Sequence, residues 1–424
     1  MIEKNYEIIL YGATGFTGQL CAKYLQDNYA DLNWAIAGRD KDKLEQLKLD
    51  LNFSGDVLIA DAQDLEALRV LAGQTKVVLS TAGPFARYGS LLVQACVEQG
   101  AHYTDITGEN HWVRDLIDKH HEEAASKGIR IIPSCGYDSI PSDIGTYFAV
   151  SQFDKPVSRV DVYQEAVGTA SGGTTETMFT MSGVSKKMRD PFILNPKNTV
   201  SDTQKKHSKD GFKIQKIEGL DGWSGIGMMA IANTRVVRRS AALMEQNQNP
   251  YGKNFIFGEH GLFKTKKLAR ITSYGLLIAV MIITSPIRHL VRPFLPKPGD
   301  GPSEEMRNKG WFRSTFIAEA EDGEQKICSV YGSGDPGYKS TSKLVCESAL
   351  ALARSDNLPR GDRYGGVLTS AVGLGDILIE RLKKAGIEFN NLQLSEVNKI
   401  YFKHEFTEDF RGNINLTAEG SDLI

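Results

Sequence analysis

Short apolar runs alternate with helical stretches through the first third of the chain. The apolar runs occupy residues 7–11, 34–37, 57–60, 77–81, 103–106 and 130–133. Helix-like stretches lie between them at residues 19–26, 41–50, 64–72, 90–99 and 111–127. Strands that are apolar on both faces and alternate with helices are typical of a parallel sheet covered on both sides. The pattern therefore predicts an α/β fold with a Rossmann-type doubly wound parallel sheet of about six strands.

The pattern changes after residue 151. Strand-like alternation appears at residues 159–165, 212–218, 311–320 and 326–331. The last two runs are joined across Glu321–Glu324, whose Asp-Gly pair is a hairpin signal. These features predict a second α+β domain with an antiparallel or mixed sheet.

Four regions follow from these patterns. We expect a dinucleotide-binding Rossmann domain at residues 1–150 and a substrate and dimerisation domain at 151–340. Residues 342–353 and 375–385 should form helices in a region, 341–390, that packs back on the first domain. Residues 391–424 form a C-terminal extension of unassigned role. The polar stretch at 186–210, with two prolines, is expected to be a mobile surface loop or lid.

A glycine-rich motif follows the first apolar run directly. It reads Gly12-Ala-Thr-Gly15-Phe-Thr-Gly18 and opens a helical stretch. Glycines at such a turn allow the tight bend, the approach of the backbone to a pyrophosphate and the close packing of helix on strand. The helix N-terminus attracts the anion. The spacing is GxxGxxG rather than GxGxxG, and a glycine triplet alone also fits a plain turn. The alternating strands and helices around it favour dinucleotide binding.

The end of the second apolar run indicates which dinucleotide binds. NAD-binding proteins usually have an acidic residue there, whereas this chain has Arg39. A guanidinium can hold a 2′-phosphate with two parallel hydrogen bonds, and Lys43 lies one helical turn further on. The alternatives are a solvated basic helix start, or Asp40 holding a ribose. We predict NADP, with NAD less favoured.

Composition excludes several classes of function. The chain has 424 residues and a formal net charge of −2, so no overall basic field draws in nucleic acid. Its five cysteines include no CxxC pair, which argues against a disulfide scaffold or a zinc site and for a reducing compartment. No secretory signal fits the first residues, and we expect a cytoplasmic protein without a metal. None of the 15 tyrosines is followed four residues later by Lys, which excludes the short-chain dehydrogenases.

Three further loops should leave the carboxyl edge of the sheet, where ligands bind in such folds. They span residues 80–89, 103–109 and 135–143. Together with GATGFTG and the AGR sequence at 37–39, they resemble the saccharopine dehydrogenase-like oxidoreductases, in the branch of the trans-acting enoyl reductases. The resemblance continues at residues 171–175, 237–240, 299–304, 334–338 and 365–370.

The resemblance implies a set of cofactor-binding residues. The cofactor would be held by Gly12, Thr14, Gly15, Phe16, Thr17, Gly18 and Arg39. Ala82 and Gly83 would lie beneath the nicotinamide ribose. Asp61 would meet the adenine amino group, or else cap the next helix. Asp105 and Glu109 would orient ligand hydroxyl groups, or else brace their loop.

The stretch Cys135-Gly-Tyr-Asp-Ser-Ile-Pro-Ser-Asp143 supplies the candidates for catalysis. Hydride transfer from a nicotinamide leaves the protein to supply position and one proton. Tyr137 is the first choice as proton donor, because a phenol also hydrogen-bonds a carbonyl oxygen. Asp138 and Cys135 are weaker candidates. A helix entrance, with Ser139 as cap, would explain part of the same motif.

One segment is unlike ordinary core. Residues 276–283 form an unbroken apolar run inside 264–297, and residues 260–299 contain several Lys and Arg but no Asp or Glu. The run is too short to span a bilayer. We predict peripheral contact with a membrane interface, at the inner face of a membrane. The alternative is a helix buried at a domain or dimer contact; a homodimer is expected.

Three functions remain open. The first is an NADPH-dependent enoyl reductase that acts on small or acyl-chain, lipid-type substrates. The second is a saccharopine dehydrogenase-type reaction on an amino acid with several carboxylates, for which Arg235, Arg238 and Arg239 are candidate ligands. The third is a non-catalytic NADP-binding protein at a membrane or lipid surface.

Overall fold

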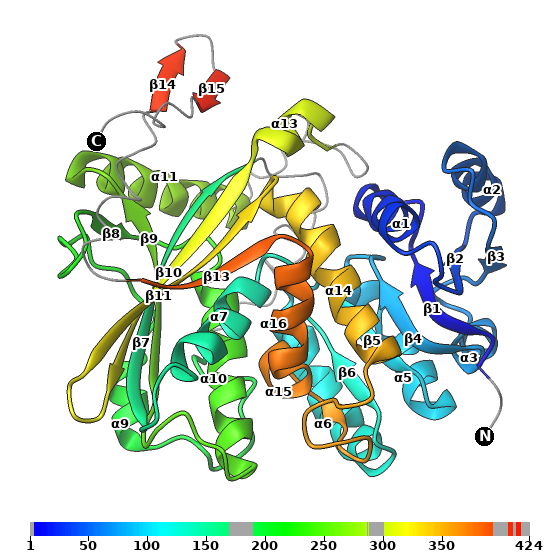
Figure 1. Cartoon of the computed structure of the whole chain (residues 1–424), viewed down its shortest axis with the longest axis horizontal. Helices are drawn as coiled ribbons and strands as arrows, with labels where there is room; N and C mark the ends of the chain where they lie inside the picture. The colour runs from blue at the N-terminus through cyan, green and yellow to red at the C-terminus, as the bar shows by residue number, and fades with distance from the viewer. Residues whose placement is uncertain are drawn as a thin grey trace.

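The computed structural model describes residues 4–168, 190–285, 287, 301–392, 406–409 and 413–416. Two β-sheets lie side by side, with helices between them and on their outer faces (Figure 1). Several stretches singled out in the sequence lie outside the described residues: the motif at 171–175, residues 299 and 300 of the motif at 299–304, and most of the C-terminal extension. Among the described residues, no helix combines the length and the hydrophobicity needed to span a bilayer.

The first sheet has seven parallel strands in the order β12-β6-β5-β4-β1-β2-β3. The strands are β1 (Tyr6–Tyr11), β2 (Trp34–Gly38), β3 (Asp56–Ile59), β4 (Thr75–Ser80), β5 (His102–Asp105), β6 (Arg130–Ile132) and β12 (Gly366–Val367). The six predicted strands are confirmed. The seventh, β12, has only two residues, which is too short to leave a pattern in the sequence.

Helices cover both faces of this sheet. They are α1 (Phe16–Asn28), α2 (Lys41–Asp50), α3 (Leu65–Gly73), α4 (Phe85–Tyr88), α5 (Ser90–Gln99) and α6 (Asn110–Ser126). From Ile8 to Tyr11 strand β1 is buried and apolar, because successive side chains enter different cores. Ile8 and Leu10 pack with α1, whereas Ile9 and Tyr11 pack in the cluster that contains α3, α5 and α6.

The second sheet has six strands in the order β13-β11-β10-β7-β9-β8 and is mixed, because β7 and β9 run parallel. The strands are β7 (Val157–Val167), β8 (Trp223–Gly225), β9 (Ile256–Phe263), β10 (Trp311–Ala320), β11 (Gln325–Ser333) and β13 (Ile387–Leu392). The hairpin between β10 and β11 is confirmed, and Gly323 adopts a φ of +91° in its turn. The mixed second sheet is also as expected.

The predicted strand at 212–218 is wrong. Lys216 forms one isolated bridge with Trp223 and no ladder follows. The neighbouring strand β8 has three residues, so it offers too few backbone groups to extend the pairing. Of the apolar residues in the segment, Ile217 is buried and keeps the alternation visible in the sequence.

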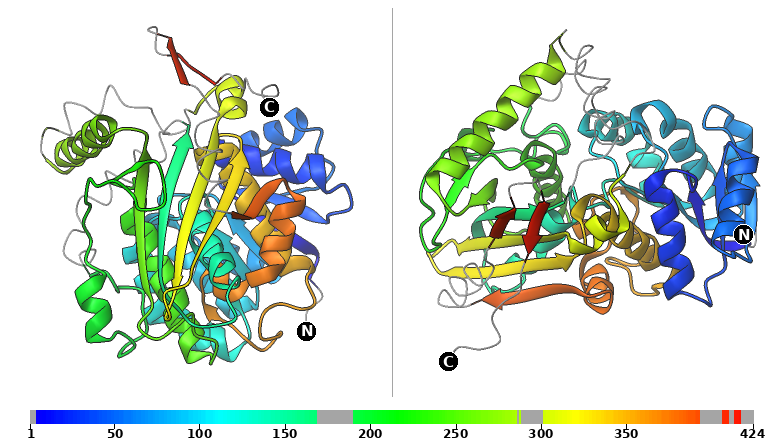
Figure 2. Two further views of the ribbon diagram at one scale, coloured as in Figure 1. Left: turned by 60° about the vertical axis from the view of Figure 1, so that its left-hand side comes forward. Right: turned by 90° about the horizontal axis from the view of Figure 1, so that it is seen from above.

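The remaining helices all follow strand β6 in the chain. They are α7 (Ile140–Val150), α9 (Asp202–His207), α10 (Ala230–Gln246), α11 (Lys266–Thr284), α13 (Glu304–Lys309), η3 (Pro336–Ser340), α14 (Thr341–Arg354), α15 (Ser370–Gly373) and α16 (Gly375–Lys384). A short hairpin, β14 (Phe406–Asp409) with β15 (Asn413–Leu416), lies apart from both sheets (Figure 2). Helix α14 packs on α1 and the first sheet, and α16 packs on α14 and β13. One apolar cluster therefore continues from the first sheet through α14 to Phe312 and Phe316 of the second.

The segment at 190–210 is held by arginines rather than free. Arg114 donates to the carbonyl oxygens of Ile193 and Asn195, at 3.2 and 3.3 Å. Arg238 donates to the carbonyl of Pro191 at 3.0 Å. These bonds tie residues 191–195 to the body of the protein, the mobility of the stretch stays a prediction, and residues 186–189 lie outside the described part.

Candidate functional site

Four loops leave the carboxyl edge of the first sheet next to one another. They follow β1, β4, β5 and β6, which are neighbours in the order β6-β5-β4-β1. Because all four strands are parallel, their carboxyl ends share one edge. The loops quoted from the sequence are thereby brought together as expected.

The glycine loop after β1 contains three glycines in different environments. Gly12 has a φ of +84°, and a Cβ there would lie 2.9 Å from the backbone nitrogen of Ala82. A Cβ on Gly18 would lie 2.3 Å from the carbonyl oxygen of Gly12. Both positions are therefore required by the packing of the chain itself. Gly15 is exposed, and a Cβ there would meet the Gly12 oxygen at 3.4 Å, an ordinary contact.

The start of α1 fits a pyrophosphate. Its N-cap residue is Gly15, and no side chain caps its first turn. By contrast, Asp40 caps α2 and Asp64 caps α3 with their side chains. The uncapped N–H groups of a helix N-terminus are the donors that hold a phosphate group in dinucleotide-binding folds. The exposed Gly15 leaves the room that this contact needs.

Phe16 fixes the glycine loop to the second part of the protein. Its ring meets the Tyr338 ring edge to face, with the centroids 4.9 Å apart. The Arg307 guanidinium lies 5.4 Å above the Phe16 ring, and a Cβ on Gly301 would collide with that ring. Residues from α13 and η3 therefore close over the loop, a role for Phe16 that the sequence alone did not indicate.

Ala82 and Gly83 follow β4, and Ala82 lies against the glycine loop. The Thr81 hydroxyl donates to the Gly12 carbonyl at 3.1 Å, which ties the two loops. A Cβ on Gly83 would touch the Phe85 ring at 3.4 Å. The small side chains expected beneath a nicotinamide ribose thus lie beside the glycine turn.

Arg39 is exposed at the end of β2. The neighbouring Asp40 accepts a bond from the Lys43 backbone at 3.2 Å and pairs with the Lys43 ammonium at 3.2 Å. Because Asp40 is engaged at the helix start, it is a poor candidate for a ribose ligand. Arg39 therefore remains the candidate for a 2′-phosphate.

Asp61 does not cap a helix. Its carboxylate accepts a bond from the Gln63 backbone at 2.8 Å, whereas Asp64 accepts from Ala67 and caps α3. The alternative that Asp61 is an N-cap is therefore wrong, because the N-cap position lies three residues later, at Asp64. Asp61 is exposed at the same edge as Arg39, and both act electrostatically on the Tyr11 phenol.

Glu109 and Asp105 brace loops. Glu109 is buried and accepts bonds from the backbone of Phe85 and Ala86, at 2.7 and 3.1 Å. Asp105 is buried and accepts from the Ser134 backbone at 2.9 Å, and burial raises its pKa to about 7. Of the two interpretations of these carboxylates, the structure supports the bracing one.

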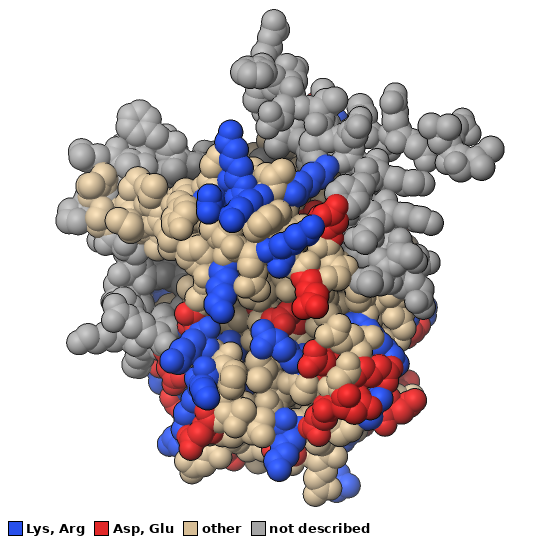
Figure 3. Space-filling view, turned by 90° about the vertical axis from the view of Figure 1, so that its left-hand side faces the viewer, with Lys and Arg blue, Asp and Glu red and all other residues tan. Residues whose placement is uncertain are grey.

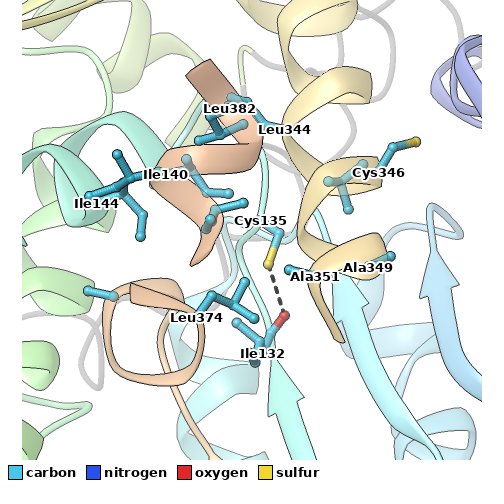
Figure 4. Close-up of a cluster of buried hydrophobic side chains, with 14 of the residues drawn as sticks. Ile132, Cys135, Ile140, Ile144, Leu344, Cys346, Ala349, Ala351, Leu374 and Leu382 are labelled. Carbon is cyan, nitrogen blue, oxygen red and sulfur yellow. Dashed lines mark hydrogen bonds between the residues drawn. The ribbon is translucent and has the colours of Figure 1, made fainter. Parts of the chain in front are cut away.

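Cys135 belongs to the hydrophobic core. Its side chain has no exposed surface, and its thiol donates to the Ile132 carbonyl at 3.2 Å. Figure 4 shows it among the side chains of Ile132, Leu344 and Ala351. Burial raises the pKa of the thiol, which keeps it neutral. The candidate role of Cys135 as a proton donor is therefore not supported, because nothing outside the core can reach it.

Tyr137 lies where the β6 loop meets the second sheet. Its ring packs on Phe312 of β10 with the centroids 5.0 Å apart, and its backbone N–H donates to the Thr341 hydroxyl at 3.0 Å. Burial raises the pKa of the phenol, and the charges of Glu259 and Asp138 raise it further. Tyr137 therefore keeps its proton at neutral pH. Burial also raises the pKa of Asp138 to about 6.

A buried polar network adjoins Tyr137. Glu259 of β9 accepts bonds from the Ser142 hydroxyl at 2.8 Å and the Asn233 amide at 2.9 Å. Ser139 stands at the N-cap position of α7, but its hydroxyl donates to the Asn233 side chain at 3.2 Å instead of capping the helix. Burial raises the pKa of Glu259 to about 7. Sequence reasoning missed Glu259, Phe312 and Thr341, because they come from distant segments.

The raised pKa of Glu259 makes stability depend on pH. The ordinary glutamate pKa is 4.5 and the folded value is about 7, so between these the folded state binds more protons and stability falls as pH rises. We expect the free energy of unfolding of Glu259→Gln to equal that of the native chain at pH 5. At pH 8 it should be higher than that of the native chain by about 2–3 kcal/mol. Thermal unfolding at both pH values measures this difference. The exposed Glu45→Gln serves as control, and equal midpoints at pH 8 for all three proteins would contradict the prediction.

The arginines proposed for a carboxylate-rich substrate are engaged elsewhere. Arg235 pairs with Asp210, and Arg238 donates to Pro191 and to a carbonyl of β9. Arg239 donates to two backbone carbonyls, one of them in β12. All three side chains are buried. They hold the 190–210 segment and α10 in place rather than lining a substrate site.

Comparison with known proteins bears on the same site. Residues 8–132 match the saccharopine dehydrogenase NADP binding domain. A trans-acting enoyl reductase of Mycobacterium tuberculosis is 32% identical over 429 residues, covering 93% of this chain and 99% of that protein. A second M. tuberculosis protein, whose name gives this activity provisionally, is 34% identical over 422 residues, covering 92% and 99%. Saccharopine dehydrogenase of Saccharomyces cerevisiae has a similar fold, with a TM-score of 0.53 at 13% identity over 91% of this chain and 99% of that one.

Proposed function

The chain belongs to the saccharopine dehydrogenase-like family of NADP-binding oxidoreductases, in the branch of the trans-acting enoyl reductases, and on this basis we propose that it is an NADPH-dependent enoyl reductase acting on acyl or lipid-type substrates. The observation that carries the proposal is the placement of Tyr137. A phenol that keeps its proton stands on the loop after β6, among the loops of the sheet edge where the cofactor binds in this fold.

Reduction of a carbon–carbon double bond next to a carbonyl takes up one hydride and one proton. NADPH supplies the hydride when it is bound. The Tyr137 phenol can hydrogen-bond the carbonyl oxygen and deliver the proton. The pKa values of Asp138 and Glu259 are raised to about 6 and about 7, so both carboxyl groups remain partly protonated near neutral pH. Either group can therefore return a proton to the Tyr137 phenol after the phenol has delivered its own.

The cofactor-binding residues follow from the fit described above. The uncapped turn at Gly15 would hold the pyrophosphate and Arg39 the 2′-phosphate. Ala82, which lies against the glycine turn, and its neighbour Gly83 would lie beside the nicotinamide ribose. Thr14 and Thr17 belong to the same loop and would contact the phosphates through it.

The chemistry around Tyr137 favours an acyl substrate over a polar amino acid. The phenol ring packs on Phe312, and the three candidate arginines of α10 are engaged with Asp210 and backbone carbonyls. A substrate with several carboxylates would need cationic groups to replace its hydration. The saccharopine-type reaction is therefore the weaker candidate.

We expect NADPH to be oxidised in the presence of enoyl thioesters, free or on an acyl carrier protein. The product should gain two hydrogens, which mass spectrometry detects. Tight NADPH binding without turnover of either form would overturn the proposal and favour a non-catalytic NADP-binding protein. Rescue of a lysine-auxotrophic strain would instead favour the saccharopine-type reaction.

Arg39→Asp should weaken NADPH binding far more than NADH binding, by roughly tenfold or more. The substitution removes a bidentate phosphate contact and adds a repulsion. Fluorescence titration with both cofactors measures the ratio. Lys48→Asp, at the other end of α2, makes the same charge change as a control. An equal loss for both cofactors would show that Arg39 does not contact the 2′-phosphate.

A further inference from the structure

Helix α11 (Lys266–Thr284) exposes a long apolar surface. Its exposed apolar side chains are Leu268, Ile271, Tyr274, Leu277, Ile278, Val280 and Met281. Ile278 and Met281 keep 56% and 66% of their surface exposed. A contiguous exposed apolar surface of this kind marks an interaction site, because its removal from water is favourable in free energy.

The helix is attached to the protein through its first turns. Ala269 and Ser273 are its fully buried positions, and the Ser273 hydroxyl accepts a bond from the Ile226 backbone at 3.0 Å. From Tyr274 onward the helix carries apolar residues on every side and lies at the periphery of the molecule (Figure 2). The attachment holds the helix, and residues 277–281 beyond it are exposed.

Cations gather where this helix begins. Lys264, Lys266, Lys267 and Arg270 are all exposed, and residues 260–299 contain no acid. Figure 3 shows Lys and Arg side chains across the upper part of this face, beside an uncharged projection. Lysines in the first turn oppose the helix dipole, which favours anions at that end. Within the chain, Lys266 lies 5.1 Å from the centroid of the Trp223 ring and Lys264 acts electrostatically on Glu165. The stability of the helix does not account for the exposed Lys267 and Arg270, whose charges suit an anionic partner.

We propose that α11 docks the protein on an anionic membrane surface. The apolar turns from Tyr274 onward lie among the headgroups and the upper acyl chains, and the basic first turns contact lipid phosphates. A second copy of the chain is a poorer occupant. Residues 260–299 of that copy would offer the cations no acidic partner. The proposal goes beyond the enoyl reductase activity and does not depend on it.

The test is flotation of the full chain with lipid vesicles. Vesicles of phosphatidylcholine alone are compared with vesicles of equal parts phosphatidylcholine and phosphatidylglycerol. The native chain should bind the anionic vesicles, and high salt should weaken binding only in part, because the apolar contact is not screened. The double variant Ile278→Asp, Met281→Asp should bind at least tenfold less, with an unchanged unfolding midpoint. The matched control carries Leu49→Asp and Val70→Asp, which are 73% and 66% exposed on the first domain and should bind as the native chain does.

A charge variant tests the same surface with little risk to folding. Lys267→Gln with Arg270→Gln should lower binding to the anionic vesicles roughly tenfold and leave the weak binding to neutral vesicles unchanged. The proposal is overturned if the native chain does not float with anionic vesicles, or if both variants bind as it does. A variant that loses its unfolding transition would show that α11 is a buried contact. A native dimer that the Asp variant splits would assign the face to self-association.

Discussion

Replacing Tyr137 with phenylalanine is expected to lower turnover by roughly 10²–10⁴-fold while leaving NADPH affinity unchanged. The substitution removes the phenolic hydroxyl and keeps the ring, whose packing on Phe312 does not involve that oxygen. The bond from the Tyr137 backbone to Thr341 is also kept. A loss of turnover in this variant would therefore reflect the missing phenolic proton and not a change of fold. Steady-state rates with an enoyl thioester, together with a cofactor titration, measure the two quantities separately.

Tyr147→Phe provides the matched control. Its hydroxyl donates to Asp376 at 3.1 Å, away from the loops of the sheet edge, so its removal should leave turnover within about twofold. If Tyr137→Phe retains near-normal turnover, the proton comes from Asp138 or from solvent. Asp138→Asn then distinguishes these sources, because only the first predicts a large loss.

The first sheet was predictable because its strands are buried on both faces. A run such as residues 8–11 is apolar without interruption, and the polar-faced helices between such runs give a second, independent pattern. The hairpin at Glu321–Glu324 was predictable from turn chemistry. These signals are local, and each element is fixed mainly by its own residues.

The partners of Tyr137 were not predictable in the same way. Phe312, Thr341 and Glu259 reach it from β10, α14 and β9, more than 100 residues further along the chain. The hydrophobic periodicity of the segments that contain these three residues does not indicate which loop they contact. The stretch at 334–338 did stand out in the sequence, and its Tyr338 closes over Phe16. A motif thus indicated an important position without indicating its neighbour.

Where two structural roles suit one residue type, the sequence left alternatives that geometry separates. Asp61 and Asp64 are both acids before a helix, and only the second accepts a bond from the first turn. Likewise an apolar run with basic flanks fits a buried helix or an interfacial one. Because Ile278 and Met281 are exposed, the helix is not buried within the single chain. Formation of a homodimer remains a prediction.

Gly15→Val is expected to weaken binding of both NADPH and NADH by roughly 100-fold or more, because a branched side chain would occupy the place of the pyrophosphate. The fold itself should tolerate the change. Gly15 has an ordinary φ of −72°, is exposed, and offers an added Cβ one contact at 3.4 Å, with the Gly12 oxygen. The unfolding midpoint of the chain without cofactor should therefore stay near that of the native protein.

Gly18→Val is the contrasting variant, because its added Cβ would lie 2.3 Å from the Gly12 carbonyl oxygen. It should lower the unfolding midpoint as well as cofactor affinity, since α1 could no longer pack on the glycine turn. Calorimetry and fluorescence titration on the two variants separate loss of a ligand contact from loss of packing. Retained affinity in Gly15→Val would mean that the loop after β1 is only a turn and that the phosphates bind elsewhere.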